Sequence, residues 1–351
     1  MDIEKYIEMA FQKKASDVHL RAGQKARIRI DGDLSIYEEV KTSEEEIWQY
    51  LTRILNDEKI ECFKKGNELD FAFTFKNICR IRANLFKQRK MLCVSMRLIP
   101  LIIPTLEELY IPPVVYNLVK LDKGLVLVTG PTGSGKSTTL AAMINYVNEH
   151  RKCHIMTIED PIEFVYEDKA ATISQREVGV DTNAFAEALV HSFRQDPDVV
   201  LIGEMRDLET MQTAITLAET GHLTFSTLHT DHAAQTINRI IDSFPPHQQT
   251  QIRMQLVVSL QGIITQRLLP MKGKKGRVAA REILVANSAV RNLIREGKIQ
   301  QIHSAIQTGT EDGMVTLNQS LGFLYEKGLI TFEIAIAASY DRKSFIEKYG
   351  T

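Results

Sequence analysis

The sequence is poor in cysteine and has no long apolar run, and each absence excludes a class of protein. Its cysteines, Cys62, Cys79, Cys93 and Cys153, are widely spaced and form no Cys-x-x-Cys pair, so no structural zinc site is expected. We interpret them as buried, reduced thiols of a cytosolic protein. No apolar stretch approaches the roughly 18–20 residues that a membrane-spanning helix needs. The N-terminus lacks the basic start and apolar core of a signal peptide, so membrane association should come through a partner.

An excess of charge of either sign is also missing. The 351 residues carry 43 Lys plus Arg against 44 Asp plus Glu, for a net charge of -1. No general positive field therefore draws the chain onto nucleic acid or acidic lipid, although a local patch could. Hydrophobic residues make up 44% of the chain, which is enough to bury a core and excludes wholesale disorder. The length predicts two domains.

Residues 1–98 are predicted to form an α+β domain. Apolar spacing indicates a first helix, Asp31-Gly32 a hairpin turn, and the Ser43/Glu46 capping box a second helix. Alternation then predicts three strands, over residues 69–75, 79–86 and 91–98. Prolines at positions 100, 104, 112 and 113 break regular structure, so we assign residues 99–113 to an interdomain linker.

The remainder, residues 114–351, changes to an α/β pattern. Short β-branched segments alternate with helical ones, which is typical of a parallel sheet wrapped by helices. The predicted strands are Leu125–Thr129, Ile155–Ile158, Val199–Ile202 and Leu223–Thr227. From about residue 287 to 351 the segments look helical and are separated by glycines.

A phosphate-binding loop gives the strongest signal of chemistry. It reads Gly130-Pro131-Thr132-Gly133-Ser134-Gly135-Lys136-Ser137-Thr138, after an apolar strand and before a helix, which is the context that a G-x-x-x-x-G-K-[ST] motif requires. Glycines let backbone N–H groups converge on phosphate, and the helix N-terminus adds its dipole. Lys136 is expected to reach the β- and γ-phosphates of ATP, and Ser137 to ligate Mg²⁺.

Hydrolysis also needs a carboxylate that orients water and support for the metal. In a parallel sheet such groups belong at the carboxyl ends of strands. One predicted strand runs into Glu159 and Glu163, the two candidates for the base, and another into Glu204, which we expect to hold Mg²⁺ through water. The alternative for each carboxylate is a solvated turn residue or a helix cap, and we assign Asp207 as a cap.

Two histidines bracket the last of these strands. His222 precedes and His229 follows Leu223–Thr227, a strand expected beside the phosphate-loop strand. We predict that both sense the γ-phosphate, against the alternative that they only pack or cap. Zinc ligation is rejected because no metal-binding helix motif or cysteine partner accompanies them.

Arginines concentrate on the predicted hairpin of residues 79–98. With residues 87–90 as its loop, paired residue numbers sum to about 177, so Arg80 should face Arg97, with Arg82 one diagonal step away. Like charges in such positions are destabilising and suggest a missing anion; the alternative is a solvated polar face. We expect Arg82 and Arg97 to reach the γ-phosphate bound on a neighbouring subunit.

Together these motifs resemble the secretion-type hexameric ATPases, over essentially the whole chain. The similarity rests on Ala15–Leu20, the phosphate loop, the acidic box Glu159–Glu163, Glu204 with its strand, and Gly221–His229. The segments Ala289–Glu296, Ile306–Gly309 and Gly313-Met314 are similar to the type IV pilus retraction branch. One departure is Asp231-His232, where that family would have Asn-Asp.

The resemblance implies a RecA-like P-loop NTPase domain after a smaller PAS-like domain, assembled as a homohexamer. It implies a motor that hydrolyses ATP to retract type IV pili in twitching motility, with Glu163 as general base. It also implies docking on a polytopic, PilC-like platform protein, at the inner face of the cytoplasmic membrane without insertion. Arg291 and Arg295 are expected on one exposed helix face that touches this partner or adjusts the ring.

Three other functions stay open from the sequence. A pilus assembly or type II secretion ATPase is one, although such proteins usually carry a four-cysteine zinc motif that this chain lacks. A RecA-like nucleic-acid translocase is another, disfavoured by near-neutral charge and the absence of an aromatic–basic stacking stretch, so no nucleic-acid partner is expected. A non-hydrolysing nucleotide switch or scaffold is the third.

Overall fold

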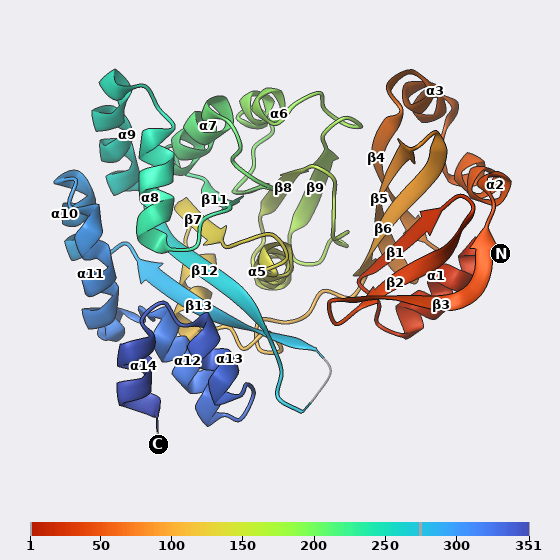
Figure 1. Cartoon of the computed structure of the whole chain (residues 1–351). Helices are drawn as coiled ribbons and strands as arrows, with labels where there is room; N and C mark the ends of the chain where they lie inside the picture. Colours follow the sequence, from red (N-terminus) through yellow and green to blue (C-terminus); the bar gives the residue numbers. More distant parts are fainter. Residues whose placement is uncertain (1, 274–275, 351) are drawn as a thin grey trace. The chain divides into compact units, whose positions relative to one another are not determined.

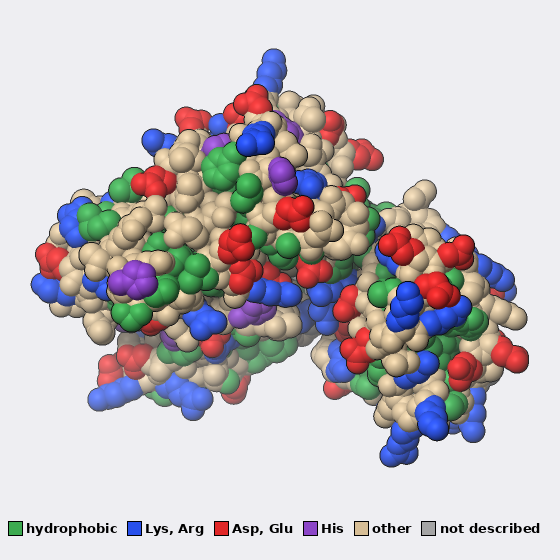
Figure 2. All heavy atoms as spheres, turned by 90° about the horizontal axis from the view of Figure 1, so that it is seen from above, with side chains coloured by type: hydrophobic (Ala, Val, Ile, Leu, Met, Phe, Trp, Pro, Cys, Tyr) green, Lys and Arg blue, Asp and Glu red, His purple; other side chains and the backbone are tan. Residues whose placement is uncertain are grey.

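A computed structural model describes residues 2–273 and 276–350. Contacts within the chain divide it into two units, each with its own sheet (Figure 1). Unit 1 comprises Met1–Ile102 and Pro161–Val165, and unit 2 comprises Ile103–Asp160 and Tyr166–Thr351. The first division, between Ile102 and Ile103, lies within the predicted linker. On the face drawn in Figure 2, Lys and Arg side chains are interspersed with Asp and Glu.

Unit 1 is an antiparallel sheet with helices. Strand order is β3-β2-β1-β6-β5-β4. The alternating sequences expected to form strands do so, and one face of the sheet buries residues such as Val18, Ile28, Ile81 and Met96 with helix residues such as Tyr6. Its elements are α1 (Ile3–Gln12), β1 (Asp17–Arg21), β2 (Gln24–Ile30), β3 (Asp33–Thr42), α2 (Glu44–Ile54), α3 (Asp57–Gly66), β4 (Glu68–Phe75), β5 (Cys79–Gln88) and β6 (Met91–Pro100).

Local signals explain how these elements begin and turn. The Ser43/Glu46 capping box is confirmed at the start of α2, and β2 turns into β3 through Asp31-Gly32, so that Ile30 pairs with Asp33. The register predicted for the β5–β6 hairpin is wrong by two residues. Arg82 faces Arg97, while Arg80 faces Ile99, because the loop consists only of Arg89-Lys90, both at positive φ. This geometry fits a two-residue type I′ turn, usually signalled by Asn-Gly or Asp-Gly.

Unit 2 contains a mixed sheet of order β13-β12-β7-β11-β10-β8-β9. Strands β12, β7, β11, β10, β8 and β9 run parallel, and β13 is antiparallel to β12. The four predicted strands are confirmed, and both of their faces are buried. The sequence did not predict β9, β12 and β13. The strands are β7 (Gly124–Thr129), β8 (His154–Glu159), β9 (Thr172–Glu177), β10 (Val199–Ile202), β11 (Leu223–Leu228), β12 (Leu260–Pro270) and β13 (Arg277–Val285).

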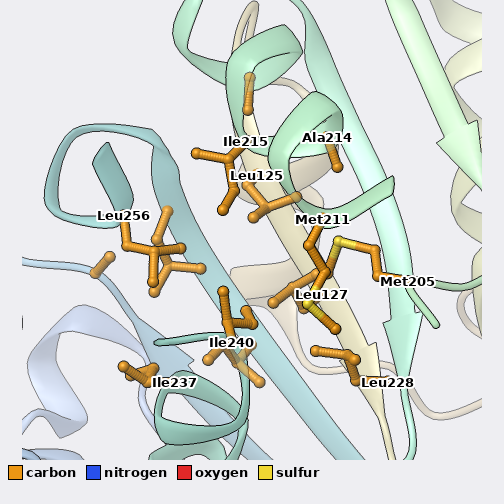
Figure 3. Close-up of a cluster of buried hydrophobic side chains, with 14 of the residues drawn as sticks. Leu125, Leu127, Met205, Met211, Ala214, Ile215, Leu228, Ile237, Ile240 and Leu256 are labelled. Carbon is orange, nitrogen blue, oxygen red and sulfur yellow. The ribbon is translucent and has the colours of Figure 1, made fainter. Parts of the chain in front are cut away.

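Helices pack against this sheet, and several of the predicted site residues follow the carboxyl ends of its parallel strands. One buried cluster joins Leu125 and Leu127 of β7 to Met211 and Ile215 of α7 and to Ile240 of α8 (Figure 3). Burial of such side chains stabilises the unit by about 25 cal/mol per Å² of apolar surface. The helices are α4 (Pro113–Val119), α5 (Lys136–His150), α6 (Phe185–Ser192), α7 (Leu208–Glu219), α8 (Ala233–Asp242), α9 (Pro246–Ser259), α10 (Ser288–Arg295), α11 (Ile302–Thr308), α12 (Leu317–Glu326), α13 (Phe332–Ala338) and α14 (Arg342–Tyr349).

Part of the predicted linker is an ordered part of unit 2. Leu106 and Ile111 are buried there, and Thr105 and Glu108 cap each other reciprocally. The guanidinium of Arg281, 3% exposed, donates to the carbonyls of Leu109 and Tyr110. Burial lowers the pKa of Arg281 to about 10. The segment from 105 to 111 is therefore held to β13 and does not behave as a free linker.

The cysteines form no disulfide among the described residues. Cys79 and Cys93 are buried free thiols, as expected, whereas Cys153 is half-buried and Cys62 is exposed, so the prediction of burial was wrong for Cys62. Burial raises the pKa of Cys79 to about 11. In the part of the chain that the structure describes, no helix has both the length and the apolar character needed to cross a bilayer.

Candidate functional site

The phosphate loop leaves the carboxyl end of β7 and enters α5 (residues 130–136), as the motif predicts. Gly130, Gly133 and Gly135 all have positive φ, at 139°, 78° and 87°, a region that side chains with a Cβ rarely adopt. At Gly130 a Cβ would also lie 2.3 Å from the carbonyl oxygen of Gln266. The loop therefore requires glycine there for both conformation and space, and it curls so that its amides precede the N-terminus of α5.

Lys136 lies in the first turn of α5 and is 8% exposed. Its Nζ donates to the carbonyls of Gly130 (2.9 Å) and Pro131 (3.1 Å), which holds the ammonium against the loop. A cation in this position can meet phosphate oxygens bound by the loop amides. Ser137 follows it on the same helical turn.

Gln266 of β12 supports the loop from behind, and sequence reasoning missed it. Its Nε2 donates to the carbonyl of Ser134 (2.8 Å), and its Oε1 accepts from the hydroxyl of Thr139 (2.9 Å). The side chain is 2% exposed, so both bonds are made away from water, where an unmade bond would cost about 1–3 kcal/mol. No local motif marks this residue, because β12 approaches the loop only through the sheet.

Glu204 lies just beyond the carboxyl end of β10, at the same edge of the sheet as the phosphate loop. Its side chain is 16% exposed and pairs with the guanidinium of Arg206, which also lies 3.6 Å from Asp160 after β8. His229, just after β11, brings Nε2 to 3.7 Å from Glu204 Oε2. Three neighbouring strands thus bring their polar residues together, and Arg206 is a member that sequence reasoning did not select.

The electrostatics of this edge favour neutral His229 and a charged Arg206. Burial is the largest effect that lowers the pKa of His229 below 6.5, and Lys136 and Arg206 add to it, while Glu204 opposes it. The hydrogen bond to Glu204 raises the pKa of Arg206. A neutral imidazole near Lys136 can offer a hydrogen bond without adding another full charge.

Glu159 is the last residue of β8 and lies at this same edge. Its carboxylate accepts from the Thr157 hydroxyl at 2.7 Å and from Gln175 Nε2 at 3.4 Å. These bonds fix a carboxylate beside the strand ends, as its position in the sequence predicts. Asp207 is confirmed as a cap, since its side chain accepts from the backbone N–H of Thr210 at the start of α7.

His222 does not join this group, and the prediction that it senses γ-phosphate is wrong. It precedes β11, and its carbonyl accepts from the N–H of Gly124 at the opposite end of β7 from the phosphate loop. Six residues of β11 separate the two edges, a span of roughly 20 Å at about 3.3 Å per residue. The ring instead lies against Phe193, with centroids 6.0 Å apart. Bracketing a strand puts two residues at opposite edges, which the prediction overlooked.

The remaining predicted site residues lie in unit 1. Arg82 and Arg97 face each other across β5 and β6. Arg97 Nε lies 3.1 Å from Asp17 Oδ1, and Arg82 Nη1 lies 3.7 Å from Glu163 Oε1. The two arginines thus have carboxylates of their own chain beside them, which offsets the repulsion between like charges.

Arg291 departs from its predicted environment. Its guanidinium donates to the carbonyls of Val257 and Val258 at the end of α9 and to Gln261 Oε1, and burial lowers its pKa. It therefore fixes α10 to α9, while Arg295 is exposed. The expectation that both arginines share an exposed face is wrong for Arg291.

The side-chain oxygens at this edge match the ligands that a magnesium ion prefers. Mg²⁺ keeps several waters and takes one or two protein oxygens together with substrate phosphates. The hydroxyl of Ser137 at the start of α5 and the carboxylate of Glu204 are oxygen ligands of this kind. Among the described residues, no group of three or more His, Cys, Asp or Glu could hold a metal ion by itself. The set fits a hydrated Mg²⁺ bound with a nucleotide better than a resident metal.

Comparison with known proteins agrees with this geometry. The family model for type II/IV secretion system proteins matches residues 1–322. The type IV pilus retraction ATPase PilT of Pseudomonas aeruginosa is 47% identical over 335 residues, which cover 95% of this chain and 97% of that protein. A twitching motility protein of Neisseria gonorrhoeae is 49% identical, and the match covers 88% of this chain and 82% of that protein.

Solved structures show the same likeness in three dimensions. A crystal structure of the pilus retraction motor PilT with bound ADP has a TM-score of 0.88 at 46% identity and covers 98% of each chain. The ATPase DotB of Legionella pneumophila has a TM-score of 0.83 at 27% identity, over 96% of this chain and 95% of that one. The chain therefore belongs to the type II/IV secretion system protein family.

Proposed function

We propose that this chain is the motor ATPase that powers type IV pilus retraction, and hence twitching motility. The chain is an ATPase of its family and binds nucleotide. The observation that carries the site is the meeting of the phosphate loop, Glu204 and His229 at the carboxyl ends of parallel strands of one sheet. Retraction as the output is supported by likeness to the retraction ATPase and the twitching motility protein over most of the chain.

At this site the loop amides and Lys136 bind the triphosphate of ATP. Ser137 and, through water, Glu204 would hold Mg²⁺, which would neutralise charge on the phosphates. His229, kept neutral by its surroundings, donates a hydrogen bond toward the γ-phosphate. Glu163 takes the proton from the attacking water, and Glu159 orients that water.

Arg82 and Arg97 complete the site in trans. Each reaches the γ-phosphate held by a neighbouring copy, so that turnover requires a ring, which we propose is a homohexamer. Because Arg82 lies 3.7 Å from Glu163, that ion pair has to open before both residues can act in this way. ATP hydrolysis then removes the anion that binds the arginines, which allows the two units to move.

Movement of the two units needs a hinge between them. Only part of the predicted linker, residues 99–113, is free to act as one. Segment 105–111 is held by Arg281 and by burial, and β6 continues to Pro100. We therefore place the hinge at residues 101–104, where Ile102 is 84% exposed. The ring would act on a platform protein at the inner face of the cytoplasmic membrane, without inserting into the bilayer.

Complementation of a deletion strain tests the proposal. The strain should keep surface pili that fail to withdraw; wild-type protein should restore withdrawal, and Glu163→Ala should not. Glu167→Ala, which removes an exposed carboxylate four residues later, is the matched control and should behave as wild type. A strain without pili would instead indicate an assembly ATPase. Stimulation of ATP turnover by single-stranded DNA would support the translocase alternative.

A further inference from the structure

The loop that carries His229 is held by residues from outside it. This loop, residues 229–232, joins β11 to α8, and the N-cap of α8, His232, makes no side-chain capping bond. Glu282 of β13 replaces the missing cap, because its Oε1 accepts from the backbone N–H of Ala233 at 2.8 Å. Its other oxygen lies 3.9 Å from His232 Nδ1. Glu282 is 3% exposed, and a buried carboxylate is tolerated only with such partners.

Tyr340 holds the same loop from the C-terminal helices. It lies between α13 and α14, and its hydroxyl donates to the carbonyl of Asp231 at 3.1 Å. The tyrosine ring contacts the ring of His232, with centroids 3.9 Å apart. The hydroxyl also accepts from Arg267 Nη2 at 2.9 Å, and Arg267 Nη1 donates to the carbonyl of Ala338. One guanidinium thus fixes both the phenol and the end of α13.

Both supports come from the β12–β13 hairpin that also holds the phosphate loop. Glu282 pairs with Thr265 across the two strands, and the next two residues of β12 are Gln266, which binds the loop, and Arg267, which binds Tyr340. A narrow recess that includes Pro131, Asp231, Glu282 and Tyr340 lies between these groups. The hairpin therefore connects two walls of the nucleotide site with the last helices of the chain.

We propose that Glu282 and Tyr340 are positioning residues that hold His229 at the γ-phosphate, so that the C-terminal helices form part of the ATPase site. The inference rests on the proposed function, specifically on the role of His229. If this is so, movement of α13 and α14 changes ATP turnover without changing how tightly the phosphate loop binds nucleotide. The alternative is that the contacts only stabilise the fold.

Tyr340→Phe separates these readings, since it keeps the ring and removes one hydroxyl. In the full-length assembled protein we expect kcat for ATP to fall roughly 3- to 10-fold, which is the effect of one hydrogen bond, at unchanged affinity for a fluorescent ATP analogue. In a His229→Ala background the same substitution should cause no further fall, because coupled residues are not additive. Tyr325→Phe, in α12 against Phe332, is the matched control and should keep normal kcat.

Hydrogen exchange distinguishes failure of this inference from failure of the role of His229. Tyr340→Phe should speed amide exchange in residues 230–234 and leave residues 130–138 unchanged. If His229→Ala lowers kcat but Tyr340→Phe changes neither kcat nor exchange, the positioning role is overturned and the role of His229 stands. If His229→Ala turns over normally, the role of His229 fails; faster exchange would then leave Tyr340 as a support for the loop alone, and the link to catalysis is overturned.

Glu282 provides a second, independent measurement. Glu282→Gln keeps an oxygen that can accept from Ala233 and should retain kcat within about twofold, whereas Glu282→Ala should lose up to roughly 10-fold, the loss expected for His229→Ala. Circular dichroism and the oligomeric state identify an alanine variant that does not fold. In that event the kcat of Glu282→Gln tests the capping role. If the variant folds but its kcat falls as far as that of His229→Ala, the capping role is contradicted.

Discussion

The two sheets of this chain present their polar residues in different ways. The mixed sheet of unit 2 gathers them at one edge, where its parallel strands β7, β8, β10 and β11 end. The antiparallel sheet of unit 1 spreads them over one face, where Arg82 and Arg97 lie opposite each other. Chain direction fixes the end of a strand at which a residue lies. Register fixes which residues meet on one face of a sheet, and a shift of one residue turns a side chain to the other face. The edge is therefore the easier of the two to predict from sequence.

The largest expected effect falls on the face of unit 1. Arg82→Ala should lower ATP turnover by about 10³-fold or more, the usual contribution of an arginine supplied in trans, while leaving nucleotide affinity nearly unchanged. Steady-state phosphate release and equilibrium binding measure the two quantities. Arg53→Ala removes a mostly exposed arginine near Glu4 and serves as the control. Normal turnover in Arg82→Ala would leave the sheet face without a catalytic function.

At the edge of unit 2, loss of the Lys136 ammonium should have a different effect from loss of Arg82. Lys136→Ala should lower turnover by about 10²- to 10³-fold and also weaken nucleotide binding, because Lys136 meets the phosphates in the ground state. The contrast with Arg82→Ala is the test, with both variants measured for binding and for phosphate release. Should Lys136→Ala bind ATP as tightly as wild type, the loop would not be the phosphate site.

The two ends of β11 provide a sharper comparison within one strand. His229→Ala should reduce kcat by roughly 10-fold, in the range of one hydrogen bond to a charged group, whereas His222→Ala at the opposite edge should change it less than about twofold. Both substitutions remove the same ring, so composition cannot explain a difference. Equal losses in the two variants would contradict the assignment of function to one edge.

The smallest expected effect is a titration shift. Burial and the nearby cations disfavour the imidazolium form, so the pKa of His229 should lie below 6.5. NMR of ¹³C-labelled histidine should therefore give a midpoint below that value, and Glu204→Gln should lower it further, since Glu204 favours the protonated ring. The folded chain binds fewer protons at this group than the unfolded chain, so its contribution to unfolding free energy decreases as pH falls below 6.5. A midpoint above 6.5 would reverse this sign.

Much of the fold follows from local pattern, but the supports of the site do not. Short β-branched segments between helical ones predicted the four strands around the nucleotide site, and the glycine loop predicted the turn into α5. The β5–β6 register was missed because Arg89-Lys90 lacks the usual turn residues. Gln266, Arg267 and Glu282 were missed because each acts on a segment far away in sequence. The pairing of β12 with β7, and of β13 with β12, brings them to the site.

The uneven burial of the thiols has a practical consequence. Cys62 on α3 is exposed, while burial holds Cys79 mostly in its unreactive protonated form near neutral pH. A maleimide dye should therefore label Cys62 first in the unaltered sequence. A second cysteine introduced into an exposed helix of unit 2 would complete a donor–acceptor pair for single-molecule fluorescence. The proposed movement of the two units could then be timed during turnover without replacing any natural thiol.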